Sequence, residues 1–284
     1  MKKNSAWLFL FIFVVCVVFV IYFVFSGRLI LPQGFAIGPF TVRYYGVIMA
    51  SAAGLGLYLS VNSAEKFKIK KKSAEDLLFW AVIGGFLGAR LYHVFSSLSY
   101  YLQNPLGIFK VWNGGMSIFG AVFGGMLALW LAKNFYKAST PFLNILNWLA
   151  PALVLGQAVG RFGNLFNYEV LGYPTGLPWG MFVPLNFRPI GFESHAFFQP
   201  FFLYEALGSV AIYFILKKIF NFQPKAPLFF WYLLLYNSLR FCLEFTRTDS
   251  VYLEGVRQNA AVSLLLAVLA AVFLVYFRKN VQTP

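Results

Sequence analysis

The sequence predicts an all-α protein that crosses a membrane several times. Hydrophobic residues make up 60% of the 284-residue chain and charged residues only 11%, whereas soluble domains carry about 25% charged residues. The mean hydropathy is +0.71. Apolar stretches long enough to cross the roughly 30 Å hydrocarbon core of a bilayer recur along the chain. Together these observations predict a polytopic membrane protein.

Eight stretches are expected to span the membrane: 7–26, 42–62, 77–95, 115–135, 142–163, 201–216, 227–246 and 258–277. The first follows Lys2 and Lys3 and runs from Trp7 to Phe25. A cleaved signal peptide usually has an apolar core of about 7–15 residues. We therefore expect this first stretch to be retained as a membrane anchor.

Basic residues gather in the segments that lie on one side of the membrane if the N-terminus is cytoplasmic. These segments are 1–6, 63–76, 133–141, 217–226 and 278–284, and they hold 14 of the 23 basic residues. This bias follows the positive-inside rule, so both termini are expected in the cytoplasm. The net charge of +14 therefore reports topology, and no nucleic-acid partner is expected. Cys16 and Cys242 lie in separate apolar runs and predict no disulfide.

Arginine is nearly absent from the predicted cytoplasmic segments, where 13 of the 14 basic residues are lysine. The other nine basic residues are Arg28, Arg43, Arg90, Lys110, Arg161, Arg188, Arg240, Arg247 and Arg257. A guanidinium group is a planar fork of donors that suits phosphate. An outer-leaflet set of arginines therefore suits a phospholipid headgroup. Snorkelling to the lipid interface is an equally good interpretation for four of them, Arg28, Arg43, Arg188 and Arg257.

Polar residues recur at helical spacing in two of the predicted spans. One polar face holds Tyr236, Asn237, Arg240, Glu244 and Arg247. The other holds Arg161, Asn164 and Tyr168, with Glu169 beside them if the helix continues. A charge near the bilayer centre costs about 2.5–3.5 kcal/mol, so Arg90, Arg161 and Arg240 must be paired, line a polar cavity or lie near the interface. The candidate partners are Glu169, Glu205 and Glu244. A structural i,i+4 ion pair between Arg240 and Glu244 is one outcome, and a polar cavity shared by the two faces is the other.

Glycines at intervals of four predict close helix packing in the third and fourth spans. Gly84 and Gly88 form one such pair, and Gly120 and Gly124 form the other. Small residues at this interval let helix backbones approach closely in lipid. Gly114 and Gly115, just before the fourth span, are candidates to present backbone N–H groups to an anion.

The segment from about 165 to 200 joins the fifth and sixth spans and is too long for a simple link. It contains five prolines and therefore cannot form one helix. Long ordered connections of this kind are commonly functional. We expect it to form a subdomain on the outer face, over a membrane core that begins near residue 31. Residues 1–30 would be an additional N-terminal anchor.

Several ordered motifs carry a resemblance to a known family. They are "IGPFTVRYYGVIM" (37–49), "EDLLFWAVIGGFLGARLYHVF" (75–95), "NPLGIFKVWNGGMSIFG" (104–120), "GRFGNLFNYEVLGYPT" (160–175), "LYEAL" (203–207) and "YNSLRFCLEFTR" (236–247). In this order they resemble the prolipoprotein diacylglyceryl transferases of bacterial membranes. The resemblance implies seven spans in the family core, so the first span looks like an addition.

The resemblance implies transfer of a diacylglyceryl group from phosphatidylglycerol to the lipobox cysteine of a prolipoprotein, with release of glycerol phosphate and no cofactor. The family's important residues correspond here to Tyr45, Arg161, Asn164, Asn167, Glu169, Gly172, Tyr236, Arg240 and Glu244, with Arg90 and Arg247 as further candidates. We expect Arg161 and Arg240 to stabilise the leaving phosphate. Asn164 and Asn167 would orient the glycerol, and Glu169 and Glu244 would hold the arginines or accept the thiol proton.

The chain departs from the family pattern at two positions. Phe119 stands where the family usually has the histidine proposed as general base, and "QPFFLYE" (199–205) replaces "HPSQLYE". A thiol of pKa about 8.5 is partly ionised at neutral pH, and loss of a base costs about 10²–10⁴-fold in rate. His93 lies three residues after Arg90 and is either a substitute base or an interfacial histidine with no chemical role. His195 is expected to be solvated.

Three functions are compatible with these features. The first is an active transferase with a different base, and the second is a catalytically impaired phospholipid-binding relative, which Phe119 favours. The third, a transporter, is disfavoured because the sequence has neither an inverted repeat nor paired broken helices. No cluster of Cys, His or Asp with metal-ligand spacing is present in the sequence, so no metal is expected.

Overall fold

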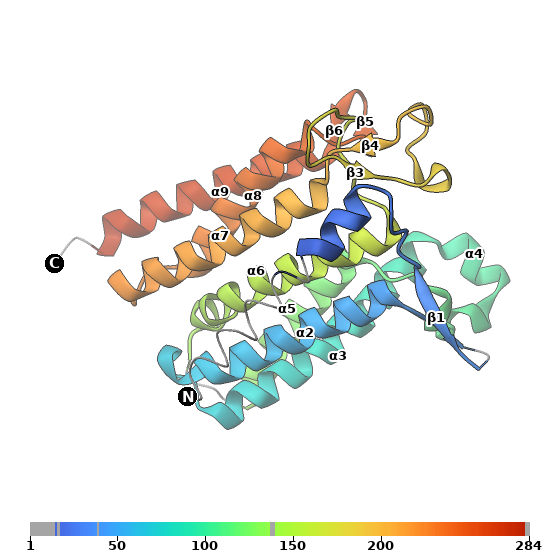
Figure 1. Ribbon diagram of the computed structural model, residues 1–284. Helices are drawn as coiled ribbons and strands as arrows, with labels where there is room; N and C mark the ends of the chain where they lie inside the picture. The colour runs from blue at the N-terminus through green and yellow to red at the C-terminus, as the bar shows by residue number, and fades with distance from the viewer. Residues whose placement is uncertain (1–14, 16–17, 39, 137–139, 282–284) are drawn as a thin grey trace, which may run out of the picture. The chain divides into compact units, whose positions relative to one another are not determined.

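The computed structural model describes residue 15 and residues 18–38, 40–136 and 140–281, and most of these residues are helical. The long helices are α2 (Tyr44–Ser63), α3 (Lys71–Ser96), α5 (Ile118–Phe135), α6 (Phe142–Asn167), α7 (Phe201–Phe222), α8 (Leu228–Glu244) and α9 (Gln258–Val281) (Figure 1). Short helical segments are η1 (Ala64–Phe67), α4 (Leu98–Gln103), η2 (Pro105–Phe109), η3 (Val111–Asn113) and η4 (Leu185–Phe187).

Six short strands pair into three antiparallel hairpins. They are β1 (Gly34–Ile37) with β2 (Phe40–Arg43), β3 (Met181–Phe182) with β4 (Phe197–Phe198), and β5 (Tyr252–Leu253) with β6 (Val256–Arg257). In the first hairpin Gly34 lies opposite Arg43. These hairpins lie in the connections, so the protein is an all-α polytopic membrane protein.

Each of the seven spans predicted after residue 40 coincides with one of the long helices. In the described part of the chain, five helical stretches are long and apolar enough to cross a membrane: Tyr44–Phe67, Lys71–Ser96, Ile118–Phe135, Phe142–Asn167 and Gln258–Lys279. The helices α7 and α8 lie where spans were also predicted but are not among these five. Half of the first predicted span, 7–26, lies outside the described residues, as do Lys2, Lys3 and Cys16, so the total of eight spans stays a prediction.

The chain forms two compact units, whose boundaries fall within α2 and α6. The first unit contains the described residues up to Gly56 and those from Ala150 onward, and the second contains Leu57–Leu149. In the second unit, a buried cluster includes Ile145 and Trp148. The Trp148 indole N–H donates to the carbonyl oxygen of Ser60 at 2.7 Å, so the ring satisfies its polar group while it is buried.

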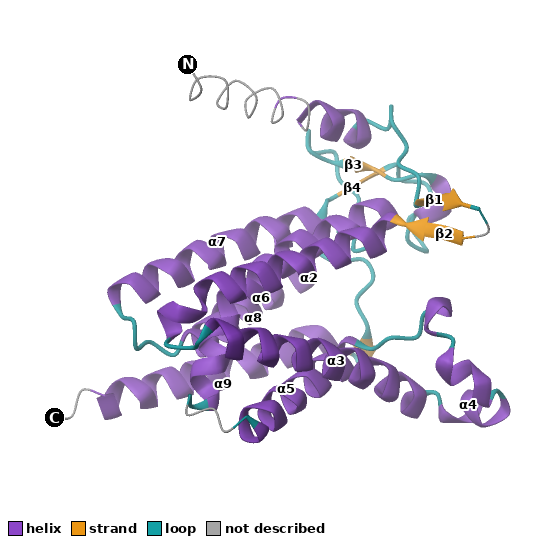
Figure 2. Ribbon diagram, turned by 90° about the horizontal axis from the view of Figure 1, so that it is seen from below, coloured by secondary structure: helices purple, strands orange, loops and turns teal. Residues whose placement is uncertain are grey.

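The predicted glycine-mediated packing is confirmed in the second unit, where α3 and α5 lie side by side (Figure 2). A Cβ atom on Gly88 would lie 2.8 Å from Cα of Gly124 and would also meet the carbonyl oxygen of Gly120. A Cβ on Gly84 would lie 2.7 Å from the Gly124 carbonyl oxygen. Backbone therefore packs directly on backbone, and only glycine permits this approach.

In the first unit, α7, α8 and α9 pack side by side (Figure 1). The loop between α6 and α7, residues 168–200, has a buried core of its own that includes Tyr168, Met181 and Phe198. Phe25 and Leu31 pack against this core, and the backbone N–H of Leu31 donates to the Tyr168 hydroxyl at 2.8 Å. Burial raises the pKa of Tyr168. The described residues just before β1 are thus attached to the loop, and the place of the loop on the outer face stays a prediction.

We expect Gly88→Ala to lower the thermal unfolding midpoint of the purified protein, because the new methyl group meets backbone atoms that cannot move aside. Overpacking of this kind costs about 1–3 kcal/mol. The control is Gly85→Ala on the same helix, whose Cβ would lie 3.4 Å from the Ala121 carbonyl oxygen. Equal midpoints for the two variants would contradict backbone contact between α3 and α5.

Candidate functional site

One buried carboxylate ties three helices of the first unit together. Glu205 on α7 is 0% exposed. Its Oε1 accepts from Arg161 Nη2 on α6 at 2.5 Å and from the Tyr236 hydroxyl on α8 at 2.7 Å. Its Oε2 accepts from Arg240 Nη1 on α8 at 2.8 Å. Arg161 and Arg240, which come from separate polar faces, therefore share a single carboxylate.

The ion pairs continue past Arg240 along the end of α8. Arg240 Nη2 donates to Glu244 Oε2 at 3.1 Å, so the expected i,i+4 pair is present. Arg247 Nη1 lies 3.7 Å from the same oxygen, and Asp249 accepts from Arg247 Nε and Nη2 at 2.8 and 2.7 Å. Asn259 Nδ2 donates to Glu244 Oε1 at 3.3 Å. Glu244 is thus held on both oxygens.

Three guanidinium groups alternate with three carboxylates in this series, which we call the arginine–carboxylate series: Arg161, Glu205, Arg240, Glu244, Arg247 and Asp249. Buried charges are tolerated when they are paired and hydrogen-bonded. The Arg161 side chain is 25% exposed, against 12% for Arg240 and 11% for Arg247. Among the described residues, Nε and Nη1 of Arg161 have no hydrogen-bond partner, so this guanidinium keeps donors for an incoming anion.

Phe201 lies against two of the three guanidinium groups. The centre of its ring is 5.7 Å from Cζ of Arg240 and 5.4 Å from Cζ of Arg247. The side chain is fully buried, and cation–π attraction is stronger where water is excluded. The "QPFFLYE" segment therefore has a structural consequence, because its Phe201 packs against Arg240 and Arg247.

A second carboxylate, Glu169, is held by two carboxamides just beyond α6. Its Oε1 accepts from Asn164 Nδ2 at 2.9 Å and from Asn167 Nδ2 at 3.2 Å. Asn164 is buried, whereas Glu169 is exposed. Glu169 differs in this respect from Glu205 and Glu244, whose oxygens are enclosed by protein donors.

The predicted polar face on α6 is wrong for Tyr168, because the helix ends before this residue. It ends at Asn167, and Tyr168 has a left-handed backbone with φ of 51°. Tyr168 therefore turns into the core of the 168–200 loop and away from Arg161 and Asn164. The same turn brings Glu169 back towards Asn164, which a continuous helix would not do.

Tyr45 and Gly172 are both held by tight backbone contacts. A Cβ on Gly163 would lie 2.9 Å from the Tyr45 ring, so the ring packs directly on the α6 backbone. The N–H of Gly172 donates to the Gln199 carbonyl oxygen at 2.9 Å, and the residue forms a β-bridge with Arg247. Gly172 thus connects the 168–200 loop to the segment that carries Arg247.

Arg90 lies in the second unit, where its guanidinium group is bonded to backbone carbonyl oxygens. Its Nε donates to the Ile108 carbonyl oxygen at 2.8 Å and its Nη2 to that of Gly107 at 2.6 Å. Its Nη1 donates to the carbonyl oxygens of Gly114 and Gly115 at 2.7 and 2.8 Å. The two glycines therefore present acceptors to Arg90, and the Gly114 N–H is bonded to Val111. Arg90 therefore stabilises the segment from Gly107 to Gly115 by bonding its carbonyl oxygens.

His93 lines a cavity of about 550 Å³ in the second unit. Tyr101, Asn104, Lys110 and Gly115 also line it, and the imidazole makes an edge contact with the Tyr101 ring at 5.9 Å between centres. Lys110 is exposed at this cavity, so a cation and an imidazole are available together.

Phe119 also lies in the second unit. Its side chain is 56% exposed, and its ring lies 6.2 Å from that of Tyr92. No proton acceptor is therefore supplied at the position where the family usually has histidine.

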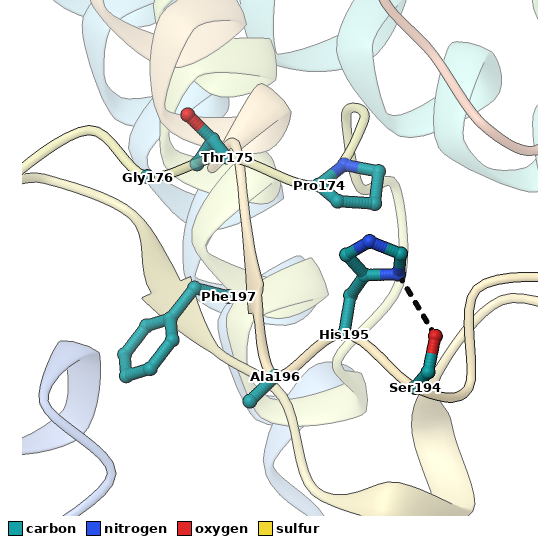
Figure 3. A pocket seen from close by; sticks show the side chains of 7 residues that line it. All are labelled: Pro174, Thr175, Gly176, Ser194, His195, Ala196 and Phe197. Carbon is teal, nitrogen blue, oxygen red and sulfur yellow. Dashed lines mark hydrogen bonds between the residues drawn. The ribbon is translucent and has the colours of Figure 1, made fainter.

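His195 lines a hollow of about 450 Å³ in the 168–200 loop (Figure 3). Its Nδ1 lies 3.2 Å from the Ser194 hydroxyl, and both side chains are exposed, as expected for a solvated histidine. Arg188 braces the same loop through the carbonyl oxygens of Val183 and Glu193. This arginine is therefore tied to protein.

Arg257 and Arg28 are also engaged by protein groups. Arg257 Nη1 donates to the Glu244 carbonyl oxygen, and its Nη2 donates to the Tyr173 hydroxyl at 3.3 Å. The Arg28 guanidinium lies over the rings of Tyr22 and Phe23 at 5.8 and 5.9 Å. Snorkelling of these two arginines to the lipid interface stays a prediction.

Glu205 was predicted only as a possible partner of the arginines, and neither Glu205 nor Phe201 nor Asn259 was among the predicted site residues. Glu205 was within reach of sequence reasoning, because it is an acidic residue inside an apolar helix and the motif "LYEAL" contains it. Phe201 and Asn259 gave no comparable signal, since each residue type is ordinary in its segment.

We expect Glu205→Gln to lower the thermal unfolding midpoint strongly, because Arg161 and Arg240 lose their shared counter-charge. Breaking a buried pair costs about 3–5 kcal/mol. Inorganic phosphate should raise the midpoint of this variant more than that of the wild type, since an anion can replace the carboxylate. The control is Glu193→Gln in the 168–200 loop, where the carboxylate is exposed. A Glu205→Gln variant as stable as this control would contradict the bridge.

Proteins named phosphatidylglycerol–prolipoprotein diacylglyceryl transferase are similar to this chain along most of its length. The protein from Acaryochloris marina is 40% identical over 237 residues, which are 82% of this chain and 86% of the relative. The protein from Fervidobacterium nodosum is 37% identical over 262 residues, covering 89% and 87% of the two chains. The protein from Synechocystis is 38% identical over 259 residues, covering 88% and 91%.

The sequence pattern of the family described as prolipoprotein diacylglyceryl transferase matches residues 32–276. This range includes the arginine–carboxylate series, the carboxamide-held Glu169 and the second-unit cavity that His93 lines. The chain belongs to the prolipoprotein diacylglyceryl transferase family.

Proposed function

We propose that this protein transfers a diacylglyceryl group from phosphatidylglycerol to the lipobox cysteine thiol of a prolipoprotein. The thiol sulfur forms a bond to the glyceryl carbon, the bond from that carbon to the phosphate oxygen breaks, and the thiol proton passes to a base. Glycerol phosphate leaves with the electron pair. The observation that carries the proposal is the bridging of Arg161 and Arg240 by one buried carboxylate.

The charge change in this reaction suits the arginine–carboxylate series. The phosphodiester of phosphatidylglycerol carries one negative charge, and the departing phosphate monoester gains a second. Fixed guanidinium groups stabilise charge that develops in the transition state without having to reorganise. Arg161 is the first contact for the phosphate, because its Nε and Nη1 donors have no partner among the described residues. Arg240 would then contribute through its positive charge, since its Nη1 and Nη2 are bonded to Glu205 and Glu244.

Glu169 is the better candidate of the two acids proposed as base. It is exposed, and only its Oε1 is held by Asn164 and Asn167. Glu244 is 0% exposed and accepts from Arg240 and Asn259, so its role is to hold the arginines. The two carboxamides keep oxygens that can accept from the glycerol hydroxyls.

The remaining predicted residues have supporting roles in this proposal. Tyr45 and Tyr236 belong to the same unit as Arg161. Gly172 and Arg247 pair with each other and connect the 168–200 loop to the end of α8. Arg90, Gly114 and Gly115 shape the cavity that contains His93, which is the alternative base.

The protein is a multi-pass membrane protein, and we also propose its orientation in the membrane. We place it in the bacterial cytoplasmic membrane with both termini in the cytoplasm and the arginine–carboxylate series toward the outer leaflet. The support is the lysine bias of the segments that would face the cytoplasm. The 168–200 loop would then be an outer-face subdomain, and residues 1–30 an additional anchor.

A second candidate function is phospholipid binding without transfer. The observation in its favour is Phe119, whose exposed ring can neither accept nor donate a proton. Purified protein that binds phosphatidylglycerol vesicles but forms no thioether on a lipobox peptide would support this alternative over the transferase.

Arg161→Gln should lower kcat for lipidation of a lipobox peptide by roughly 10²-fold or more, because a charge stabiliser of the leaving phosphate is lost. The assay uses purified protein, phosphatidylglycerol vesicles and mass detection of the thioether. Arg278→Gln in the last turn of α9, an exposed arginine, is the control and should retain activity. Full turnover in Arg161→Gln would reject the phosphate role.

Glu169→Gln should lower the rate at pH 7 by about 10²–10⁴-fold, as expected for the loss of a general base. The deficit should shrink as the pH rises to about 9, because the peptide thiol, with a pKa of about 8.5, then ionises unaided. Glu244→Gln should lose stability without this alkaline recovery. A Glu169→Gln deficit that is constant between pH 7 and 9 would exclude Glu169 as the base.

Phe119→His should raise the lipidation rate at pH 7 by about tenfold or more if the base supplied elsewhere is weak, since an imidazole of pKa about 6.5 is mostly neutral there. The matched control is Phe123→His, one turn further along α5 and also exposed. Equal rates for the two variants would show that no base is missing at position 119.

A further inference from the structure

A second polar layer lies one helical turn beneath the Glu205 bridge, in the same three helices. Gln157 precedes Arg161 by four residues on α6, and Tyr232 precedes Tyr236 by four residues on α8. On α7, which runs in the opposite direction, Ser209 follows Glu205 by four residues. Four residues raise a helix by about 6 Å, so each member lies one turn further along the same face.

The Gln157–Tyr232 pair repeats the Arg161–Tyr236 pair one turn lower, and the helix registers predict the place of Ser209. The side chains of Arg161 and Tyr236 meet at 3.5 Å and are 75 residues apart in sequence. Gln157 Nε2 donates to the Tyr232 hydroxyl at 2.9 Å, and these two residues are also 75 apart. Glu205 contacts both members of the upper pair, so the same register places Ser209 next to the lower pair. The lower layer has no charged member.

Two polar atoms of this layer are buried without a partner. Gln157 Oε1 and Ser209 Oγ have no hydrogen-bond partner among the described residues, and Ser209 is 0% exposed. The Tyr232 hydroxyl accepts from Gln157, which leaves its own proton to donate. Buried polar groups in folded proteins are almost always satisfied, either by protein or by ordered water. An amide oxygen, a serine hydroxyl and a phenol offer three partners, and a buried water typically makes about three hydrogen bonds.

We propose that Gln157, Ser209 and Tyr232 bind an internal water one turn beneath Glu205, and that this hydrated layer positions Tyr236 against the Glu205 carboxylate. The link is the stacking of Tyr232 on Tyr236, whose ring centres are 5.8 Å apart with 23° between the planes. A Tyr232 ring fixed by the amide and the water holds the Tyr236 ring, and the Tyr236 hydroxyl donates to Glu205 Oε1. Ser209 and Gln157 are positioning residues in this arrangement and do not touch substrate.

The sign of one stability change tests the water site. Removal of an unpartnered hydroxyl from a dry site relieves a penalty, whereas removal of a hydroxyl that holds a water loses hydrogen bonds. Ser209→Ala should therefore lower the thermal unfolding midpoint of the full-length protein. Alanine has the higher helix propensity, so propensity alone would raise the midpoint. Ser51→Ala on α2, where the exposed hydroxyl bonds only its own helix, is the control and should leave the midpoint unchanged or raised.

A midpoint for Ser209→Ala equal to or above that of the wild type would overturn the water site. Ser209→Thr keeps the hydroxyl and should restore most of any loss caused by alanine. A high-resolution experimental map should show density within hydrogen-bonding distance of Gln157 Oε1 and Ser209 Oγ. A map in which the two side chains bond each other directly, with no density between them, would also overturn it.

The positioning role rests on the proposed transferase function and is tested separately. Ser209→Ala should lower kcat for peptide lipidation by about tenfold and leave KM for phosphatidylglycerol unchanged, since Tyr236 is displaced but Arg161 is not. Ser209→Thr should restore kcat. An unchanged kcat together with a lowered midpoint would leave the water site standing and reject its positioning role. Absence of transfer by the wild type would reject the transferase function, while the midpoints would still decide the water site.

Discussion

The structure of the first unit depends on one constraint, which is that two arginines in apolar helices must share a buried carboxylate. A guanidinium group cannot shed its charge, so each arginine needs a fixed acceptor. Glu205 supplies an acceptor to each of them, because its Oε1 bonds Arg161 and its Oε2 bonds Arg240. The carboxylate thereby sets the register of α6, α7 and α8, because Glu205 on α7 bonds one group of α6 and two groups of α8.

This arrangement also explains how a site for an anion can exist in a charge-balanced cluster. The arginine–carboxylate series contains equal numbers of opposite charges, yet its members differ in exposure. The carboxylates Glu205 and Glu244 are enclosed, whereas Arg161 is a quarter exposed. The series therefore presents positive charge at its Arg161 end, whereas at its other end Asp249 is 46% exposed beside Arg247. Phe201 packs on Arg240 and Arg247 and limits the freedom of these two guanidinium groups.

Much of the fold was predictable because membrane helices follow simple rules of length and polarity. The helices after residue 40 occur where apolar runs were found, and the glycine pairs on α3 and α5 pack as their spacing indicates. The pairing of Arg240 with Glu244 follows from helical spacing alone. Local periodicity determined each of these features.

The rest depended on contacts between segments that are distant in sequence. The role of Glu205 requires three helices in register, and Arg90 uses carbonyl oxygens, which every residue possesses and no sequence pattern marks. The turn at Tyr168 depends on a left-handed backbone at a residue that rarely adopts one. Sequence periodicity also could not show that Glu169 returns to Asn164, because that contact exists only after the helix has ended.

A structure of the protein with a non-reactive phosphatidylglycerol analogue in a lipid nanodisc would test the central claim most directly. The account predicts phosphate oxygens within hydrogen-bonding distance of Arg161 Nε or Nη1, with Glu205 still bonded to both Arg161 and Arg240. A phosphate bound only in the cavity lined by His93 and Lys110, with Arg161 uncontacted, would contradict it.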